Sequence, residues 1–212
     1  MNTALKNRLI RTLILALIGL IAGGGIAYYQ IQNDVRYGAS RDVGATAVPG
    51  VKVGGDFTLT NHLGERQSIS AWGDQYKLIY FGFTYCPAIC PTELQKISAV
   101  LNRLDDEQAA KIQPIFITVD PERDNVATMK DYISLFHPKL VGFTGGVQEI
   151  DAVKKDYRVF AAKTPIDDGA DYTMDHSSYI YLMSPDNTLI SIYRIQDDVK
   201  FILSDLKEKG LL

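Results

Sequence analysis

Cys86 and Cys90 are the only cysteines in the chain of 212 residues, and three residues separate them. Because they are so close, they cannot join distant parts of a fold, so a disulfide framework is excluded. Neighbouring thiols of this kind suit metal binding or thiol–disulfide exchange. Pro91 is typical of the first turn of a helix. At that position, free backbone N–H groups and the helix dipole favour a thiolate on Cys90.

The three histidines decide whether a metal site is complete. His62 falls in a predicted hairpin turn and His137 follows a predicted helix, so we expect both to be surface or capping residues. His176 lies at the entrance to the last predicted hairpin, and loops at one edge of an open α/β sheet meet at a crevice. A ligand role and a structural role are both open for it. Two thiolates with one imidazole would select Cu(I) or Zn(II), and an open position suits a metal that is handed on.

The elements that must bring these residues together are predicted from hydrophobic patterns. Short apolar runs rich in β-branched and aromatic residues predict buried strands at 77–84, 113–120 and 140–143. Turn residues between alternating segments predict hairpins at 57–69 and 178–194. Helical spacing predicts helices at 91–104, 126–136, 147–159 and 198–209. Strands alternating with helices, plus a terminal hairpin, predict an α/β domain with helices on both faces of a mixed sheet.

The segment from Thr12 to Asn33 carries no charge. A helix needs about 20 apolar residues to cross a bilayer, so residues 1–33 are predicted to form a membrane anchor with one transmembrane helix. A cleaved signal peptide is the alternative. Basic residues precede the segment, which predicts that the following domain lies across the membrane. Because no Arg- and Ser-rich transit peptide precedes it, we expect a bacterial inner membrane, with the domain in the periplasm.

The rest of the chain divides into a linker and one domain. Residues 34–50 are small and polar without an apolar period, as in a linker, and residues 51–212 form the predicted domain. The net charge is −3, and no stripe of Lys and Arg is present. These features argue against a nucleic-acid partner.

Three motifs resemble those of the Sco/SenC family over roughly residues 51–206. They are Phe83-Thr-x-Cys86-Pro-x-x-Cys90-Pro91, Val119-Asp-Pro-Glu-Arg-Asp124, and Asp175-His176-Ser-Ser178 followed by Tyr181-Leu182 and Pro185-Asp186. The resemblance implies a thioredoxin-like fold and one copper ion, Cu(I) or Cu(II), held by Cys86, Cys90 and His176. It also implies a metallochaperone, not primarily an enzyme, that serves the dinuclear copper centre of cytochrome c oxidase subunit II. Other copper-handling or thiol-redox proteins are further implied partners.

Two positions depart from the family pattern. Ala88 stands where an acidic residue is usual, and Tyr85 stands where the family often has histidine. The first change removes a carboxylate beside the thiolates, yet it leaves the three implied ligands intact. For the motif at 119–124, we expect a satisfied turn in which Arg123 pairs with an acidic neighbour, in preference to a partner contact.

Three other functions compete with a copper chaperone. A thiol–disulfide reductase would use Cys86 and Cys90 as a redox-active disulfide to keep the oxidase cysteines reduced. A peroxide reductase is suggested by the Cys-Pro-Thr-Glu sequence that starts at Cys90, but Pro87 stands where peroxiredoxins need a hydroxyl. A copper sensor or scaffold cannot be separated from a chaperone by sequence.

Overall fold

The computed structural model describes residues 16, 19–20, 23–25, 28, 52–166 and 171–212. Residues 1–42 and 43–212 form separate compact units, and the fold below is that of the second. Most of the predicted anchor at 1–33, and all of the predicted linker at 34–50, lie outside the described residues. Within the described ranges, no helix is long and apolar enough to cross a membrane.

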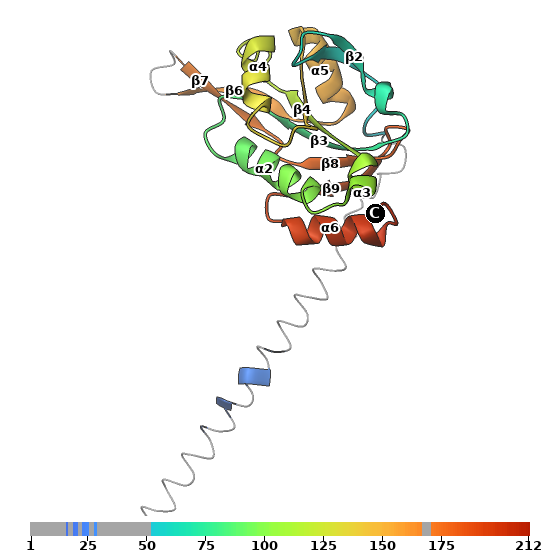
Figure 1. The fold of residues 1–212 in the computed structure, drawn as a ribbon. Coiled ribbons are helices and arrows are strands. Elements are labelled where there is room, and N and C mark those ends of the chain that lie inside the picture. The colour runs from blue at the N-terminus through green and yellow to red at the C-terminus, as the bar shows by residue number, and fades with distance from the viewer. Residues whose placement is uncertain (1–15, 17–18, 21–22, 26–27, 29–51, 167–170) are drawn as a thin grey trace, which may run out of the picture. The chain divides into compact units, whose positions relative to one another are not determined.

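A mixed sheet of seven strands forms the centre of this unit (Figure 1). The strand order is β2-β1-β5-β4-β3-β8-β9, and the three central strands β5, β4 and β3 are parallel. β8 and β1 pair antiparallel to β3 and β5. The strands are β1 (Thr58–Asn61), β2 (Arg66–Ser68), β3 (Tyr76–Gly82), β4 (Ile112–Thr118), β5 (Val141–Thr144), β8 (Ile180–Met183) and β9 (Leu189–Tyr193).

Helices cover both faces of the sheet. They are η1 (Ile69–Trp72), α2 (Ile89–Leu101), α3 (Asp106–Ala110), α4 (Val126–Ile133), α5 (Val147–Asp156) and α6 (Val199–Glu208). α2 packs against β3 and α6, and α5 lies on the other side of the sheet (Figure 1). Consecutive residues of β3 face opposite sides of the sheet, so Tyr80 lies toward Cys90 of α2, and Phe81 lies toward Tyr157 after α5. The predicted mixed sheet with flanking helices is confirmed.

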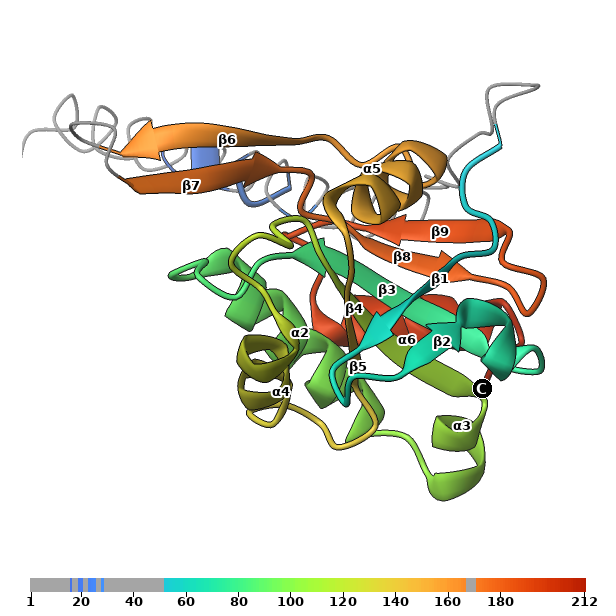
Figure 2. The same ribbon diagram turned by 90° about the horizontal axis from the view of Figure 1, so that it is seen from above.

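A ribbon of two strands was not predicted from the sequence. β6 (Ala161–Ile166) and β7 (Asp171–His176) pair only with each other and extend from the body of the domain (Figures 1 and 2). Most of their residues are polar and at least partly exposed, so they lack the apolar alternation of a half-buried strand. The helix predicted to reach 159 ends at Asp156, because Arg158 has a φ of 56° and cannot continue it. The ribbon begins three residues after Arg158, at Ala161.

Candidate functional site

The cysteine loop connects the end of β3 to the start of α2. Its first part is fixed by the buried Asp124, which accepts hydrogen bonds from Thr84 N (3.0 Å) and Thr84 Oγ1 (2.5 Å). Gly82 closes the strand where there is no room for a side chain, because a Cβ there would lie 2.8 Å from Cys90 Sγ. The loop therefore enters α2 with Cys90 in the first helical turn, directly against the strand.

The two cysteines have different surroundings. Both are free thiols, but Cys90 is buried, whereas Cys86 is partly exposed. The backbone N–H of Cys90 donates to Cys86 Sγ at 3.4 Å. This bond joins the loop cysteine to the first turn of α2.

These surroundings shift the pKa values of the two thiols in opposite directions. A hydrogen bond from the Cys90 side chain lowers the pKa of Cys86, and a bond from His176 adds to this against the opposing effect of burial. The same Cys86–Cys90 bond, together with burial, raises the pKa of Cys90. The pair therefore holds its negative charge on Cys86 and its proton on Cys90.

His176 is the last residue of β7 and faces the cysteines. Its Nε2 lies 3.5 Å from Cys90 Sγ, and its Nδ1 lies 3.1 Å from the carbonyl oxygen of Ser177. Because a carbonyl only accepts hydrogen bonds, Nδ1 carries a proton in this arrangement, and Nε2 is the ring nitrogen that faces the sulfur of Cys90. The ring of Phe83 meets the imidazole edge to face, with ring centroids 5.7 Å apart, and limits its rotation.

Tyr80 also contacts the cysteine pair, although its position in the sequence did not indicate this. Its buried hydroxyl donates to Cys90 Sγ at 3.7 Å, and it also hydrogen-bonds the side chain of Ser178. Burial raises the pKa of Tyr80, so its hydroxyl keeps its proton and remains a donor. In the sequence Tyr80 is one aromatic residue in an apolar strand, and nothing there distinguishes it from a core residue.

The structure thus brings together Cys86, Cys90 and His176, the three predicted ligands. Within residues 52–166 and 171–212, no three His, Cys, Asp or Glu side chains are already arranged as a metal site. Cys86 and Cys90 instead make hydrogen bonds, and Cys90 Sγ accepts one from the Tyr80 hydroxyl. The donor set of two thiols and one imidazole fits a soft metal ion, and its ligand role stays a prediction.

The other two histidines are engaged with the backbone elsewhere. His62 Nδ1 accepts from Gly142 N at 3.3 Å, and His137 Nδ1 accepts from Lys139 N at 3.1 Å. Burial lowers the pKa of both imidazoles, so each is suited to accept these bonds as a neutral ring. Both have the local structural role that their positions in turns predict.

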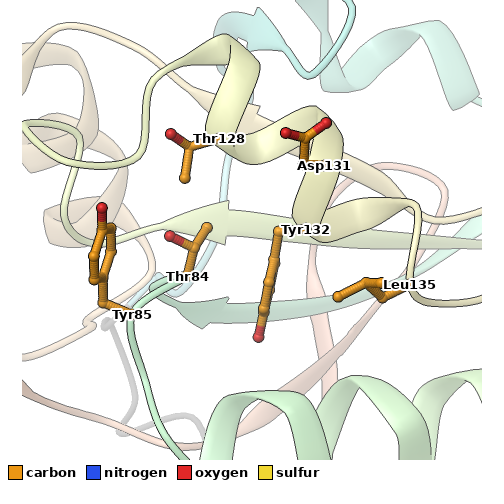
Figure 3. Close-up of a pocket in the computed structure, with 6 residues that line it drawn as sticks. All are labelled: Thr84, Tyr85, Thr128, Asp131, Tyr132 and Leu135. Carbon is orange, nitrogen blue, oxygen red and sulfur yellow. The ribbon is translucent and has the colours of Figure 1, made fainter.

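A cavity of about 400 Å³ lies beside the cysteine loop and is open on one side (Figure 3). The loop contributes one wall, and α4 with the residue two positions after it contributes the other. The lining residues are Thr84, Tyr85, Thr128, Asp131, Tyr132 and Leu135. None of the predicted ligands lines it, so the cavity is separate from the cysteine–histidine cluster.

Known proteins are similar to most of this chain. The family model described as SCO1/SenC matches residues 46–209. A curated relative from Danio rerio, "Protein SCO2 homolog, mitochondrial", is 46% identical over 148 residues, which are 69% of this chain and 53% of the relative. The chain spans about half the length of this relative, and similar shares hold for several other curated relatives.

Solved structures extend the likeness to the fold. Arabidopsis thaliana ScoI, solved with copper bound, is 39% identical with a TM-score of 0.70, over 74% of this chain and 98% of that one. The expected thioredoxin-like fold is thereby confirmed. A second structure, of BsSco, is 25% identical with a TM-score of 0.58, over 76% of this chain and 95% of that one. It is described as showing a disulfide switch in a member of the Sco family of cytochrome c oxidase assembly proteins.

The relatives correct the expected location. A bacterial inner membrane with a periplasmic domain was predicted, but the curated relatives above are named as mitochondrial proteins. That prediction is wrong. It depended on the positive-inside pattern and on the lack of a transit peptide. The charge pattern indicates which side of a membrane a domain faces, and it does not identify the membrane.

Proposed function

The chain belongs to the SCO1/SenC family, and from this premise we propose that it binds one copper ion through Cys86, Cys90 and His176. The observation that carries the proposal is the 3.5 Å approach of His176 Nε2 to Cys90 Sγ, with Cys86 hydrogen-bonded to both residues. Two thiolates and an imidazole are soft ligands, which suit Cu(I). Copper-bound structures of relatives with this fold support the choice of metal.

The residues of the chain prepare this ligand set in specific ways. The lowered pKa of Cys86 favours its thiolate, and the side chain is partly exposed, so we expect Cys86 to be the first ligand that an incoming ion meets. The carbonyl oxygen of Ser177 binds Nδ1 of the imidazole, so Nε2 is the nitrogen that faces the sulfur of Cys90 and would bind copper. Cys90 keeps its proton in the metal-free state, so copper uptake releases a proton from this residue.

A titration of the reduced full-length chain with Cu(I) tests the ligand assignment. We expect one equivalent to bind, and we expect Cys86→Ser, Cys90→Ser and His176→Ala each to weaken binding strongly. His62→Ala and His137→Ala are the matched controls, because these imidazoles are engaged with the backbone. Equal losses in all three histidine variants would refute His176 as the third ligand.

We further propose that the bound copper is cargo for the dinuclear copper centre of cytochrome c oxidase subunit II. Support comes from the motif resemblance and from the family role stated for BsSco. Cells lacking the protein should lose oxidase activity, and added copper should restore part of it by mass action. Full oxidase assembly by the His176→Ala variant at limiting copper would contradict delivery, because this variant keeps both thiols and lacks a ligand.

Thiol–disulfide exchange is the second candidate function, because Cys86 and Cys90 are free, adjacent and divided into a thiolate and a thiol. A reductase of the oxidase cysteines would depend on both cysteines and would not need His176. Reduction of a disulfide-bonded peptide from the subunit, followed with the His176→Ala and Cys90→Ser variants, separates the two functions. Activity kept in the first and lost in the second supports the reductase.

We also propose that residues 1–33 anchor the domain to a membrane. The absence of charge from Thr12 to Asn33 supports this. Anchoring would confine the domain to the bilayer of a membrane-bound recipient and raise its effective concentration there. A chain of residues 1–212 should stay in the membrane fraction after alkaline carbonate extraction, and release into the supernatant would refute the anchor.

A further inference from the structure

The turn at residues 119–124 lies between the two halves of the proposed copper site. It follows β4, and its last residue, Asp124, is fully buried. The Asp124 carboxylate accepts hydrogen bonds from Thr84 N and Thr84 Oγ1 in the cysteine loop, and from Thr118 Oγ1 in β4. Through these hydrogen bonds the turn fixes Thr84, which lies two positions before Cys86 in the cysteine loop.

The other side of the turn holds the ribbon that carries His176. Arg123 Nη1 donates to the carbonyl oxygen of Tyr172 at 2.8 Å and lies 3.3 Å from an Asp171 carboxylate oxygen. The guanidinium carbon of Arg123 lies 3.8 Å from the centre of the Tyr172 ring. The Tyr172 hydroxyl donates to Asp120 at 2.9 Å. Two residues of the turn, Asp120 and Arg123, therefore both bind Tyr172 of β7.

The same guanidinium also faces the cysteine loop. It lies 4.8 Å from the ring centre of Tyr85 and 6.0 Å from that of Phe83, whose ring in turn meets His176. Arg123 is therefore placed between Tyr172 of the ribbon and the aromatic residues beside the cysteines. A charge desolvated among aromatic rings interacts more strongly with them than one in water does.

Contacts between residues of the turn itself explain only part of these interactions of Arg123. The Arg123–Asp120 ion pair at 2.5 Å spans three residues and is the pairing that the sequence predicts. The contacts to Asp171 and Tyr172, however, reach 48 and 49 residues along the chain. β6 and β7 have no strand partner in the main sheet, so their position depends on such contacts.

We propose that Arg123 is a positioning residue, which holds the β6–β7 ribbon against the cysteine loop and thereby sets the distance from His176 to the two thiols. The proposal rests on the proposed copper function only in assigning a ligand role to His176. The chemistry requires arginine, because one planar guanidinium donates to Asp120 and Tyr172 while it stacks on a ring. A lysine ammonium supplies the charge without the flat, forked geometry.

Copper affinity in a double-mutant cycle tests the proposal. We expect Arg123→Lys to weaken Cu(I) binding about ten- to a hundredfold, the range seen when groups that orient metal ligands are lost. In the His176→Ala background, Arg123→Lys should cause no further loss, because it acts through that imidazole. Arg66→Lys is the matched control, since Arg66 forms an exposed ion pair with Glu149. Equal losses from Arg123→Lys in both backgrounds would overturn the proposal.

A metal-free measurement gives an independent readout. In the Arg123→Lys variant, amide hydrogens of Ala161–Ile166 and Asp171–His176 should exchange faster, while those of β3 and β4 stay protected. Exchange unchanged in the ribbon, or faster throughout, contradicts a positioning role. If Arg123→Lys does not fold, Tyr172→Leu removes the ring that the Arg123 guanidinium stacks on and the hydroxyl that donates to Asp120, and it carries both tests. A wild-type chain that binds no copper refutes the proposed function, and the exchange experiment still decides the positioning role.

Discussion

At the scale of single residues, the pair Cys86 and Cys90 consists of two identical side chains with different proton affinities. The Cys86 thiolate accepts from the Cys90 thiol, from the Cys90 backbone and from His176, whereas Cys90 is buried beneath it. Reactivity follows the thiolate, so Cys86 is the nucleophile of the pair and Cys90 the proton reservoir.

This difference predicts selective alkylation. The pKa of Cys86 is lowered, so its thiolate persists as the pH falls well below the ordinary thiol range. At pH 6, iodoacetamide should therefore modify Cys86 in preference to Cys90, as read by peptide mass spectrometry. Cys90→Ala removes the main hydrogen-bond donor, which should raise the pKa of Cys86 and slow its alkylation at pH 6. An unchanged rate in that variant would show that the assigned cause is wrong.

Tyr80 offers a second test at this scale. Tyr80→Phe keeps the ring and removes the donor to Cys90 Sγ, so the electron density on that sulfur should change. We expect a shifted thiolate-to-copper charge-transfer band with Cu(II) and about tenfold weaker copper binding. Tyr157→Phe is the control, because its buried hydroxyl donates to Gly55 O, outside the cysteine cluster. Identical spectra for Tyr80→Phe and the wild type would count against a tuning role.

At the scale of elements, the junction between β3 and α2 is the most constrained part of the site. Gly82→Ala should place a methyl group 2.8 Å from Cys90 Sγ and 2.9 Å from the Tyr80 ring. We expect a loss of about 1–3 kcal/mol in the free energy of unfolding, as for other overpacked cores, together with weaker copper binding. Gly73→Ala is the control, since its nearest atom lies 3.5 Å away. Similar denaturation midpoints for the two variants would contradict this.

The same elements show how far the sequence could predict the structure. β3, β4 and α2 were predictable because their apolar residues follow strand or helix periodicity and are buried. The β6–β7 ribbon was not, because its strands are held by each other and by contacts such as Arg123–Tyr172, which leave no apolar period. The grouping of Cys86, Cys90 and His176 was predictable from residue type and motif, and their ligand role stays a prediction. Tyr80 and Arg123 make contacts with residues far along the chain, and the hydrophobic periodicity of the sequence does not indicate such contacts.

At the scale of the whole molecule, a metal that binds only the folded chain stabilises the fold. The proposed ligands come from the β3–α2 loop and from β7, so copper should join these parts in one cooperative unit. Free Cu(I) at a hundredfold above Kd should raise the free energy of unfolding by about 2.7 kcal/mol, less any binding to the unfolded thiols. Thermal melts of the reduced chain with and without Cu(I) measure this. His62→Ala should keep the stabilisation and His176→Ala should lose most of it; stabilisation kept in both variants would contradict the prediction.

The separation of 86 residues between Cys90 and His176 has a consequence for the newly made chain. A ribosome adds about 5–20 residues per second, so the cysteines are synthesised roughly 4–17 s before the histidine. During that interval the nascent chain carries two thiols without the imidazole, and the ribbon that will present the imidazole does not yet exist. Copper captured then would be held by an incomplete set of donors and would exchange readily. With the proposed ligand set, productive copper loading would begin only after translation has passed β7.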